Sequence, residues 1–478
     1  MVLTGTLTFS EFTFNFVFDE NKLRIIPITD ENKVILFGWK KEKNANGLTE
    51  YIPQHSQVIE DEFIVGYCNE TNSKIIFLPQ VNSYISGPKN FLNPKSPISI
   101  PLSAYILFSS KEEPISRLAI CCPEINYIHP ITQAFEFQFN WEEFRKGNVS
   151  LNTKPFETTT TDKQSFFCAE KNVNVYFGIS RSFENRIDEA PLKLTSTMYF
   201  EFEPTDDYSF ILYLWRIARQ FVRFLCYRKN ICIPKMELFT PSDDGKHEKS
   251  GFIYLIEDDE CNSELTALKN GRYIKQEYIA GHEGEILSDI VQNNIYTRHI
   301  PDTYASGRII DAARFVMITA AFEWEFNRLY PEGVEHSESM TKAIREVETK
   351  LQELIENTKG KQKKIYKRLL KSASFDSLSS EICKACEDFS DIVGIFGEHL
   401  YSINNEKLDY VEMGERLANQ RNNFAHGNID KNLNSLSILD LVFLEFLIYA
   451  MQLKHYEIED TIIQKVINEL FRRNIALE

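Results

Sequence analysis

Residues 410–427 read YVEMGERLANQRNNFAHG, and this stretch governs the interpretation of the C-terminal third of the chain. Its apolar residues recur at helical spacing, with one gap in the series: Tyr410, Met413, Leu417 and Phe424. That periodicity predicts an amphipathic helix with one face toward a core. Gly427 is of the residue type that commonly ends a helix, so we expect the helix to stop there.

Arg421 occupies the gap in this apolar series. A guanidinium on a face that is to be buried needs a partner or a functional role, because an unpaired buried charge is costly. In an unbroken helix, Arg421 and His426 would point about 140° apart, since each residue turns the helix by about 100°. If the two side chains act on one substrate, either the helix ends near His426 or a second copy of the chain supplies one of them.

Composition limits the class of protein. The chain has 478 residues, 43% of them hydrophobic, which predicts two or three domains with sizeable cores. Its net charge of −16 creates a field that repels nucleic acid, which argues against indiscriminate binding but leaves room for a local basic site. The nine cysteines show no disulfide-like spacing and the N-terminus shows no signal-peptide pattern. We therefore predict a cytoplasmic protein that does not enter a membrane.

Hydrophobic patterning predicts an α+β protein in three parts. Residues 1–160 form a β-rich N-terminal domain, because runs such as FTFNFVF at 12–18 alternate apolar and polar side chains. Residues 161–295 form a second β-rich part with one amphipathic helix near 208–227. We expect these strands to build sandwich-like sheets. Residues 300–478 form an all-α bundle.

The helices of this bundle follow from the same periodicity. A first helix is predicted to end near Tyr330, and further helices are predicted over 338–358, 361–373, 375–403, 407–426, 434–454 and 458–474. Residues 436–451 are apolar nearly all round but include Asp440 and Glu445. A helix of this kind is typically buried inside a bundle or against a partner subunit.

The order Arg421, Asn422 and then His426, with four residues between the arginine and the histidine, resembles the signature of the HEPN (higher eukaryotes and prokaryotes nucleotide-binding) superfamily. A helix end and an all-helical C-terminal third accompany the motif, as in that superfamily. The order of a β-rich region before such a domain is similar to ApeA-type proteins, which are associated with anti-phage defence. Only Arg421, Asn422 and His426 carry specific motif identity.

The resemblance implies a metal-independent endoribonuclease that acts as a homodimer and needs no cofactor. His426 would transfer the protons, because imidazole accepts and donates protons near neutral pH. Arg421 would stabilise the phosphate in the transition state, and Asn422 would hydrogen-bond His426 or a phosphate oxygen. Attack by the ribose 2′-hydroxyl would leave a 2′,3′-cyclic phosphate and a 5′-hydroxyl. ApeA-like architecture further implies abortive infection, with a phage-derived or small-molecule trigger sensed by the N-terminal region.

One dense basic segment lies in the same domain, at residues 359–371. Its cations are candidate RNA-binding residues: Lys361, Lys363, Lys364, Lys367 and Arg368. The alternative is a solvated, lysine-rich helix face with no ligand.

Other interpretations remain open. The C-terminal domain can be a non-catalytic HEPN module for dimerisation or nucleotide binding, with a ligand- or protein-binding β-region. Cys383 and Cys386, with His399 beyond them, faintly resemble zinc ligands, but no second histidine follows at finger spacing, so we expect buried core cysteines. Glu323 and Glu325 can contact RNA or His426, but we expect them to pair with a bundle arginine, Arg314 or Arg328.

Overall fold

The structure is a computed structural model. It describes residues 2–9, 12–19, 21–29, 32, 39–43, 46–53, 63–71, 73–80, 97–109, 114–136, 141–147, 152–183, 188, 190, 192–243, 245–256, 264–373, 376–427 and 435–477. The chain divides into two compact units, which are described separately. The first unit comprises Met1–Arg223, Asn230–Ser263 and Gly281–Val291. The second comprises Phe224–Lys229, Glu264–Ala280 and Gln292–Glu478.

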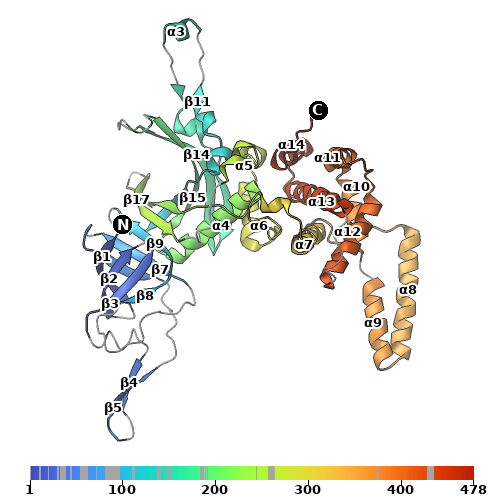
Figure 1. Cartoon of the computed structure of the whole chain (residues 1–478), viewed down its shortest axis with the longest axis horizontal. Coiled ribbons are helices and arrows are strands. Elements are labelled where there is room, and N and C mark those ends of the chain that lie inside the picture. Colours follow the sequence, from blue (N-terminus) through green and yellow to red (C-terminus); the bar gives the residue numbers. More distant parts are fainter. Residues whose placement is uncertain are drawn as a thin grey trace. The chain divides into compact units, whose positions relative to one another are not determined.

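The first unit is built on one large antiparallel sheet (Figure 1). Its thirteen described strands are β1 (Leu3–Phe9), β2 (Phe12–Asp19), β3 (Lys22–Pro27), β6 (Ile64–Cys68), β7 (Lys74–Pro79), β8 (Ile98–Ile100), β9 (Leu102–Phe108), β10 (Ile115–Ile120), β13 (Gln164–Cys168), β14 (Lys171–Phe183), β15 (Leu192–Thr205), β16 (Lys235–Pro241) and β17 (His247–Leu255). Their order across the sheet is β13-β14-β15-β10-β16-β17-β9-β7-β6-β1-β2-β3-β8.

The sheet confirms the β-rich N-terminal region, but as one continuous sheet in place of separate sandwiched sheets. Strand β9 pairs with both β7 and β17, which joins the N-terminal strands to the later ones. Strand β10 lies between β15 and β16, so the sheet continues across the expected division at residue 160. Long-range pairing of this kind leaves no mark in local periodicity, which is why sequence alone suggested two parts.

Alternation explains how each strand packs. In β2, Phe14, Phe16 and Phe18 are buried while the residues between them are partly or fully exposed. These phenylalanines belong to a hydrophobic core that includes Phe77, whose ring lies 5.3 Å from that of Phe16, edge to face. Aromatic pairs in this arrangement stabilise a sheet through area burial and favourable ring geometry.

Shorter elements complete the first unit. They are β4 (Trp39–Lys43), β5 (Thr49–Pro53), α2 (Ile125–Ile128), β11 (Phe135–Glu136), α3 (Trp141–Arg145), β12 (Asn152–Thr153), α4 (Tyr208–Cys226) and α6 (Glu283–Gln292), with 3-10 turns η1 (Ile131–Ala134) and η2 (Phe156–Thr159). Helix α4 confirms the predicted amphipathic helix. It packs on the sheet through Phe210, whose ring lies 5.1 Å from that of Phe202 in β15.

The second unit is helical, as predicted. Its elements are α5 (Leu265–Lys269), η3 (Gln276–Tyr278), η4 (Ser306–Arg308), α7 (Ala312–Leu329), α8 (Glu338–Asn357), α9 (Lys361–Ala373), α10 (Leu378–Asp388), α11 (Ser390–Ser402), α12 (Tyr410–Ala425), α13 (Ser435–Lys454) and α14 (Asp460–Leu470). The helix expected over 375–403 is two helices, because the chain turns at Phe389, where φ is −100° and ψ is 10°. Neither glycine nor proline marks that break.

Helix α13 forms the core of this unit. It is long and apolar enough to cross a membrane, but 78% of its apolar window is buried among the other helices, which identifies it as a core helix. Three of its buried polar side chains, Asp440, Glu445 and Gln452, form hydrogen bonds that offset part of the cost of burial. Asp440 accepts hydrogen bonds from Arg416 and Tyr401, Glu445 from Arg314 and Tyr227, and Gln452 donates to Glu325. The predicted burial of Asp440 and Glu445 is confirmed.

Candidate functional site

Helix α12 carries the Arg421/His426 motif, and its two ends are well defined. At the start, the Asp409 side chain accepts hydrogen bonds from the backbone N–H groups of Val411 and Glu412, at 3.0 and 3.1 Å. At the other end, His426 caps the helix and Gly427 has a φ of +79°, a value that favours glycine. The helix therefore ends just before His426, which confirms the predicted helix end.

Close packing fixes the orientation of α12. A Cβ added to Gly414 would lie 2.7 Å from the backbone oxygen of Ser379, so α12 and α10 approach each other as only glycine allows. Arg416 binds the buried carboxylate of Asp440 through two nitrogens, at 2.8 and 2.9 Å. Such two-point contacts determine geometry as well as energy. The motif thus stands on a rigidly anchored helix.

Arg421 lies at the edge of the core, and its side chain is 35% exposed. Its Nη2 donates to both carboxylate oxygens of Glu323 in α7, at 3.0 and 3.1 Å. Its Nη1 donates more weakly to the side-chain oxygen of Asn422, at 3.4 Å. The expectation of a fully buried apolar face is wrong at this position, although Phe424, the next residue of the same stripe, is buried.

The partners expected for the two α7 glutamates are corrected in part. Glu325 lies 3.0 Å from Arg328, as predicted. Glu323 instead pairs with Arg421, while Arg314 pairs with Glu445 in α13. Periodicity places a glutamate on a face, but the packing of helices decides which arginine it meets.

His426 is exposed at the end of the helix. Its backbone N–H donates to the carbonyl of Asn422 at 3.1 Å, which completes the last turn. Its imidazole forms no hydrogen bond or ion pair with a residue that the structure describes. The ring is therefore accessible to a ligand. Arg421 lies at the same end of α12, on its last turn.

A second carboxyl group lies near Arg421. Burial and the neighbouring carboxylates of Glu323 and Asp376 raise the pKa of Glu381 to about 7, and Arg421 offsets this only in part. Asp376 itself lies 2.9 Å from His336. A glutamate that titrates near neutral pH beside an arginine is a common feature of functional sites. Nothing in the residue spacing of α10 links Glu381 to α12, so the sequence alone gives no signal for this carboxyl group.

The five candidate RNA-binding residues lie on α9, which packs against α8 as an antiparallel pair (Figure 1). Lys361, Lys364, Lys367 and Arg368 are exposed and Lys363 is partly exposed. Within the described residues, no hydrogen bond or ion pair links these side chains with Arg421 or His426.

Of the candidate zinc ligands, Cys386 is buried, Cys383 is partly exposed and His399 is exposed. Cys383 contacts Glu387, with 3.6 Å between sulfur and oxygen, and burial raises the pKa of both thiols. In the described part of the chain, no group of three or more His, Cys, Asp or Glu side chains could hold a metal ion.

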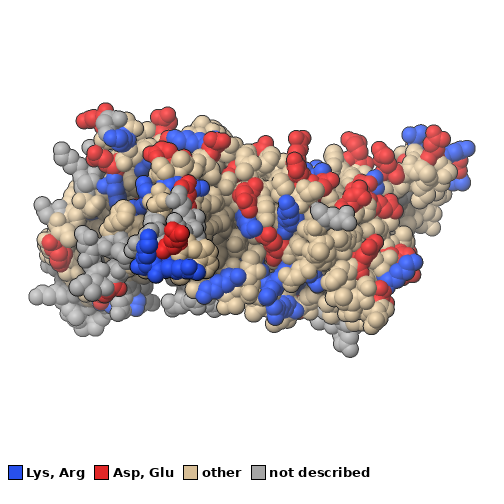
Figure 2. Space-filling model, turned by 90° about the horizontal axis from the view of Figure 1, so that it is seen from above, with Lys and Arg blue, Asp and Glu red and all other residues tan. Residues whose placement is uncertain are grey.

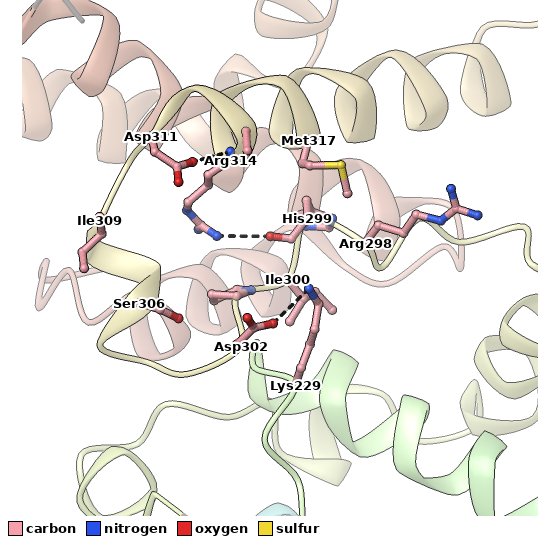
Figure 3. Close-up of a pocket in the computed structure, with 12 residues that line it drawn as sticks. Lys229, Arg298, His299, Ile300, Asp302, Ser306, Ile309, Asp311, Arg314 and Met317 are labelled. Carbon is pink, nitrogen blue, oxygen red and sulfur yellow. Dashed lines mark hydrogen bonds and ion pairs between the residues drawn. The ribbon is translucent and has the colours of Figure 1, made fainter. Parts of the chain in front are cut away.

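The second unit also contains a cavity of about 360 Å³ (Figure 3), and the motif residues Arg421, Asn422 and His426 are not among its lining residues. Two of its three cationic lining residues, Arg314 and Lys229, have partners. Arg314 donates to the carbonyl of His299 and pairs with Glu445, and Lys229 lies 3.2 Å from Asp302. Arg298, the third, forms no hydrogen bond or ion pair with a residue that the structure describes.

With this geometry established, the chain was compared with known proteins. No family model, curated protein or solved structure matches it.

Proposed function

We propose that this chain is a metal-independent endoribonuclease of HEPN type. The observation that carries the proposal is the end of α12, where the helix stops just before His426 and its exposed imidazole forms no hydrogen bond or ion pair with any described residue. Arg421, on the last turn, has guanidinium N–H groups that Glu323 and Asn422 do not use.

Each group has a definite task in the proposed reaction. The imidazole of His426 takes the proton from a ribose 2′-hydroxyl, whose oxygen attacks the adjacent phosphorus. Arg421 stabilises the negative charge that develops on the phosphate oxygens. The bond from phosphorus to the 5′-oxygen breaks, and that oxygen takes a proton. The products are a 2′,3′-cyclic phosphate and a 5′-hydroxyl.

A homodimer completes the proposal, since a second copy supplies a second imidazole. One imidazole accepts the proton from the nucleophile while the other, protonated, donates to the leaving oxygen. The RNA follows the basic residues of α9 in this proposal. If Lys361, Lys364 and Lys367 each contact one phosphate, replacing all three with Gln lowers the salt-dependence slope of RNA binding by about 2.

The rival proposal is a non-catalytic HEPN module for dimerisation or nucleotide binding, with a ligand- or protein-binding β-region. One observation favours it, since the Arg421–Glu323 ion pair gives the arginine a structural role. Under this alternative, Arg421→Ala and His426→Ala leave function intact.

The two proposals are separated by cleavage of total cellular RNA in EDTA, with analysis of the fragment ends. We expect wild type to produce cyclic-phosphate ends, and Arg421→Ala and His426→Ala to be inactive. His399→Ala removes another exposed histidine of the same unit and serves as the matched control. Equal cleavage by wild type and all three variants would show that the activity comes from another site or from a contaminant.

We further propose that the nuclease acts in the cytoplasm in anti-phage defence, and that the N-terminal sheet senses a phage-derived or small-molecule trigger. Cells that express wild type or His399→Ala should restrict phage plating, and cells that express His426→Ala should not. If cells that express His426→Ala still restrict phage plating, the defence role does not depend on the nuclease.

A further inference from the structure

Four arginines gather in the second unit, although the chain as a whole has a net charge of −16. Arg272 follows α5, Arg308 ends η4, and Arg472 and Arg473 follow α14. On the face drawn in Figure 2, basic side chains are interspersed with acidic ones. Four guanidinium ions that form no ion pair with a described carboxylate are unusual against that background.

Tyr304 is at the centre of the group. The guanidinium carbon of Arg272 lies 3.6 Å from the centre of the Tyr304 ring, and that of Arg308 lies 4.8 Å from it. Arg308 Nη2 also donates to the Tyr304 hydroxyl at 2.8 Å. Stacking on an aromatic ring holds a guanidinium in a defined orientation while its N–H groups stay available.

Part of the hydrogen-bonding capacity of this group is unused. The Nε atoms of Arg272 and Arg473 are buried and have no acceptor in the described structure. None of the four arginines forms an ion pair with a described carboxylate. The nearby Glu264 is engaged elsewhere, since it accepts from the Tyr304 backbone N–H at 2.8 Å and lies 3.7 Å from Arg228.

The electrostatics of the four arginines favours an anionic ligand. Burial, together with the charges of Arg308, Arg472 and Arg473, lowers the pKa of Arg272 to about 10, although Tyr304 acts in the opposite direction. Buried donors without acceptors and like charges held together both cost free energy. An anion that reaches several guanidinium groups at once would remove both costs. A single carboxylate brings only one charge, whereas clustered phosphates bring several charges and match the guanidinium fork.

We propose that Arg272, Arg308, Arg472 and Arg473 form a binding site for a ligand with clustered phosphate groups, separate from Arg421 and His426. Arg272 and Arg308, oriented by Tyr304, form the fixed part of the site. Arg472 and Arg473, in the chain segment after α14, add positive charge that acts on Arg272. The phosphates come either from a small polyphosphate compound or from the backbone of RNA.

The test is calorimetric titration of the full-length protein with sodium tripolyphosphate at low salt. Wild type should bind saturably, and binding should weaken as salt is added. Arg472→Gln and Arg272→Gln should each weaken binding by about tenfold or more, as expected for lost hydrogen bonds to a charged group. Arg345→Gln removes one exposed arginine of α8 and should bind like wild type.

Arg472 is exposed, so Arg472→Gln tests the site without disturbing packing, and an unchanged melting temperature verifies its fold. Arg421→Ala should bind tripolyphosphate normally, which keeps this site distinct from the nuclease proposal. Absence of saturable binding by wild type, or equal binding by Arg472→Gln and Arg345→Gln, would overturn the assignment.

Two further titrations identify the source of the phosphates. If ATP binds and loses affinity in Arg472→Gln while a short RNA does not, the ligand is a small polyphosphate compound. If the RNA loses affinity in Arg472→Gln and is displaced by tripolyphosphate, the site binds the RNA backbone.

Discussion

The Nη2 atom of Arg421 donates to both carboxylate oxygens of Glu323, at 3.0 and 3.1 Å. This pair connects the last turn of α12 with α7. In the proposed reaction, a phosphate that approaches Arg421 would meet a carboxylate that already neutralises part of the arginine's charge. Under that proposal, Glu323 is a positioning residue for Arg421 and competes with the phosphate for it.

The first prediction concerns Glu323→Gln, which keeps the size of the side chain and removes its charge. Both partners are about one-third exposed, so solvent screening limits the pair to less than about 1 kcal/mol. If Arg421 binds phosphate, Glu323→Gln should raise the cleavage rate by up to about fivefold in single-turnover assays. Glu323→Gln combined with His426→Ala should be inactive. A large loss of activity in Glu323→Gln would instead show that the carboxylate is required.

The second prediction concerns pH and Glu381. Its pKa is raised from 4.5 to about 7, so its contribution to stability is full below about pH 4.5 and is lost as pH rises through about 7. Glu381→Gln carries no charge at any pH. The melting temperature of Glu381→Gln should therefore match that of wild type near pH 4.5 and exceed it by a few degrees at pH 8.

Glu398→Gln replaces an exposed glutamate of α11 and is the control for this pH series. Its melting temperature should follow wild type throughout. A constant difference between Glu381→Gln and wild type from pH 4.5 to pH 8 would contradict the raised pKa.

The third prediction concerns Arg416 and the buried Asp440. Arg416→Met removes both hydrogen bonds to a carboxylate that has no exposed surface and leaves that charge paired only with Tyr401. Breaking a buried pair from one side costs about 3–5 kcal/mol, so the free energy of unfolding should fall by roughly that amount in urea titrations. Arg345→Met, on exposed α8, should stay within about 0.5 kcal/mol of wild type.

The fourth prediction concerns Tyr227, which the sequence did not connect with the helical unit. Its hydroxyl donates to Glu445 and lies 3.2 Å from Nη2 of Arg314. Tyr227→Phe leaves this buried cluster short of one hydrogen bond, which should cost about 1–3 kcal/mol of unfolding free energy. Tyr213→Phe, at a partly exposed tyrosine whose hydroxyl has no described partner, should be close to neutral.

The same contact bears on domain truncation. A fragment of residues 300–478 matches the predicted helical domain but lacks residues 292–299 as well as Phe224–Lys229 and Glu264–Ala280, which contain Tyr227 and Lys275. Lys275 lies 3.1 Å from Glu469 of α14. We expect this fragment to unfold at lower urea concentration than the helical unit in the full chain. Equal stability would show that the segments missing from the fragment do not contribute to the stability of the helical unit.

Local periodicity determined much of this protein. Alternating side chains in FTFNFVF predicted strand β2, and steps of three and four residues predicted α12 and its end near His426. The all-round apolar character of α13 predicted its burial, including that of Asp440 and Glu445. These features depend on residues close together in the chain, because the periods of helices and strands are local properties.

Tertiary structure alone decided the rest. It joined β9 to β17 in one sheet, divided the expected helix at Phe389, and added residues 224–229 and 264–280 to the helical unit. It also paired Arg421 with Glu323, which lies 98 residues away in the sequence. Contacts between distant segments are selected by how whole elements pack, and no short pattern records that choice. The sequence therefore determined which elements form and where the motif lies, whereas packing decided the partners of its side chains.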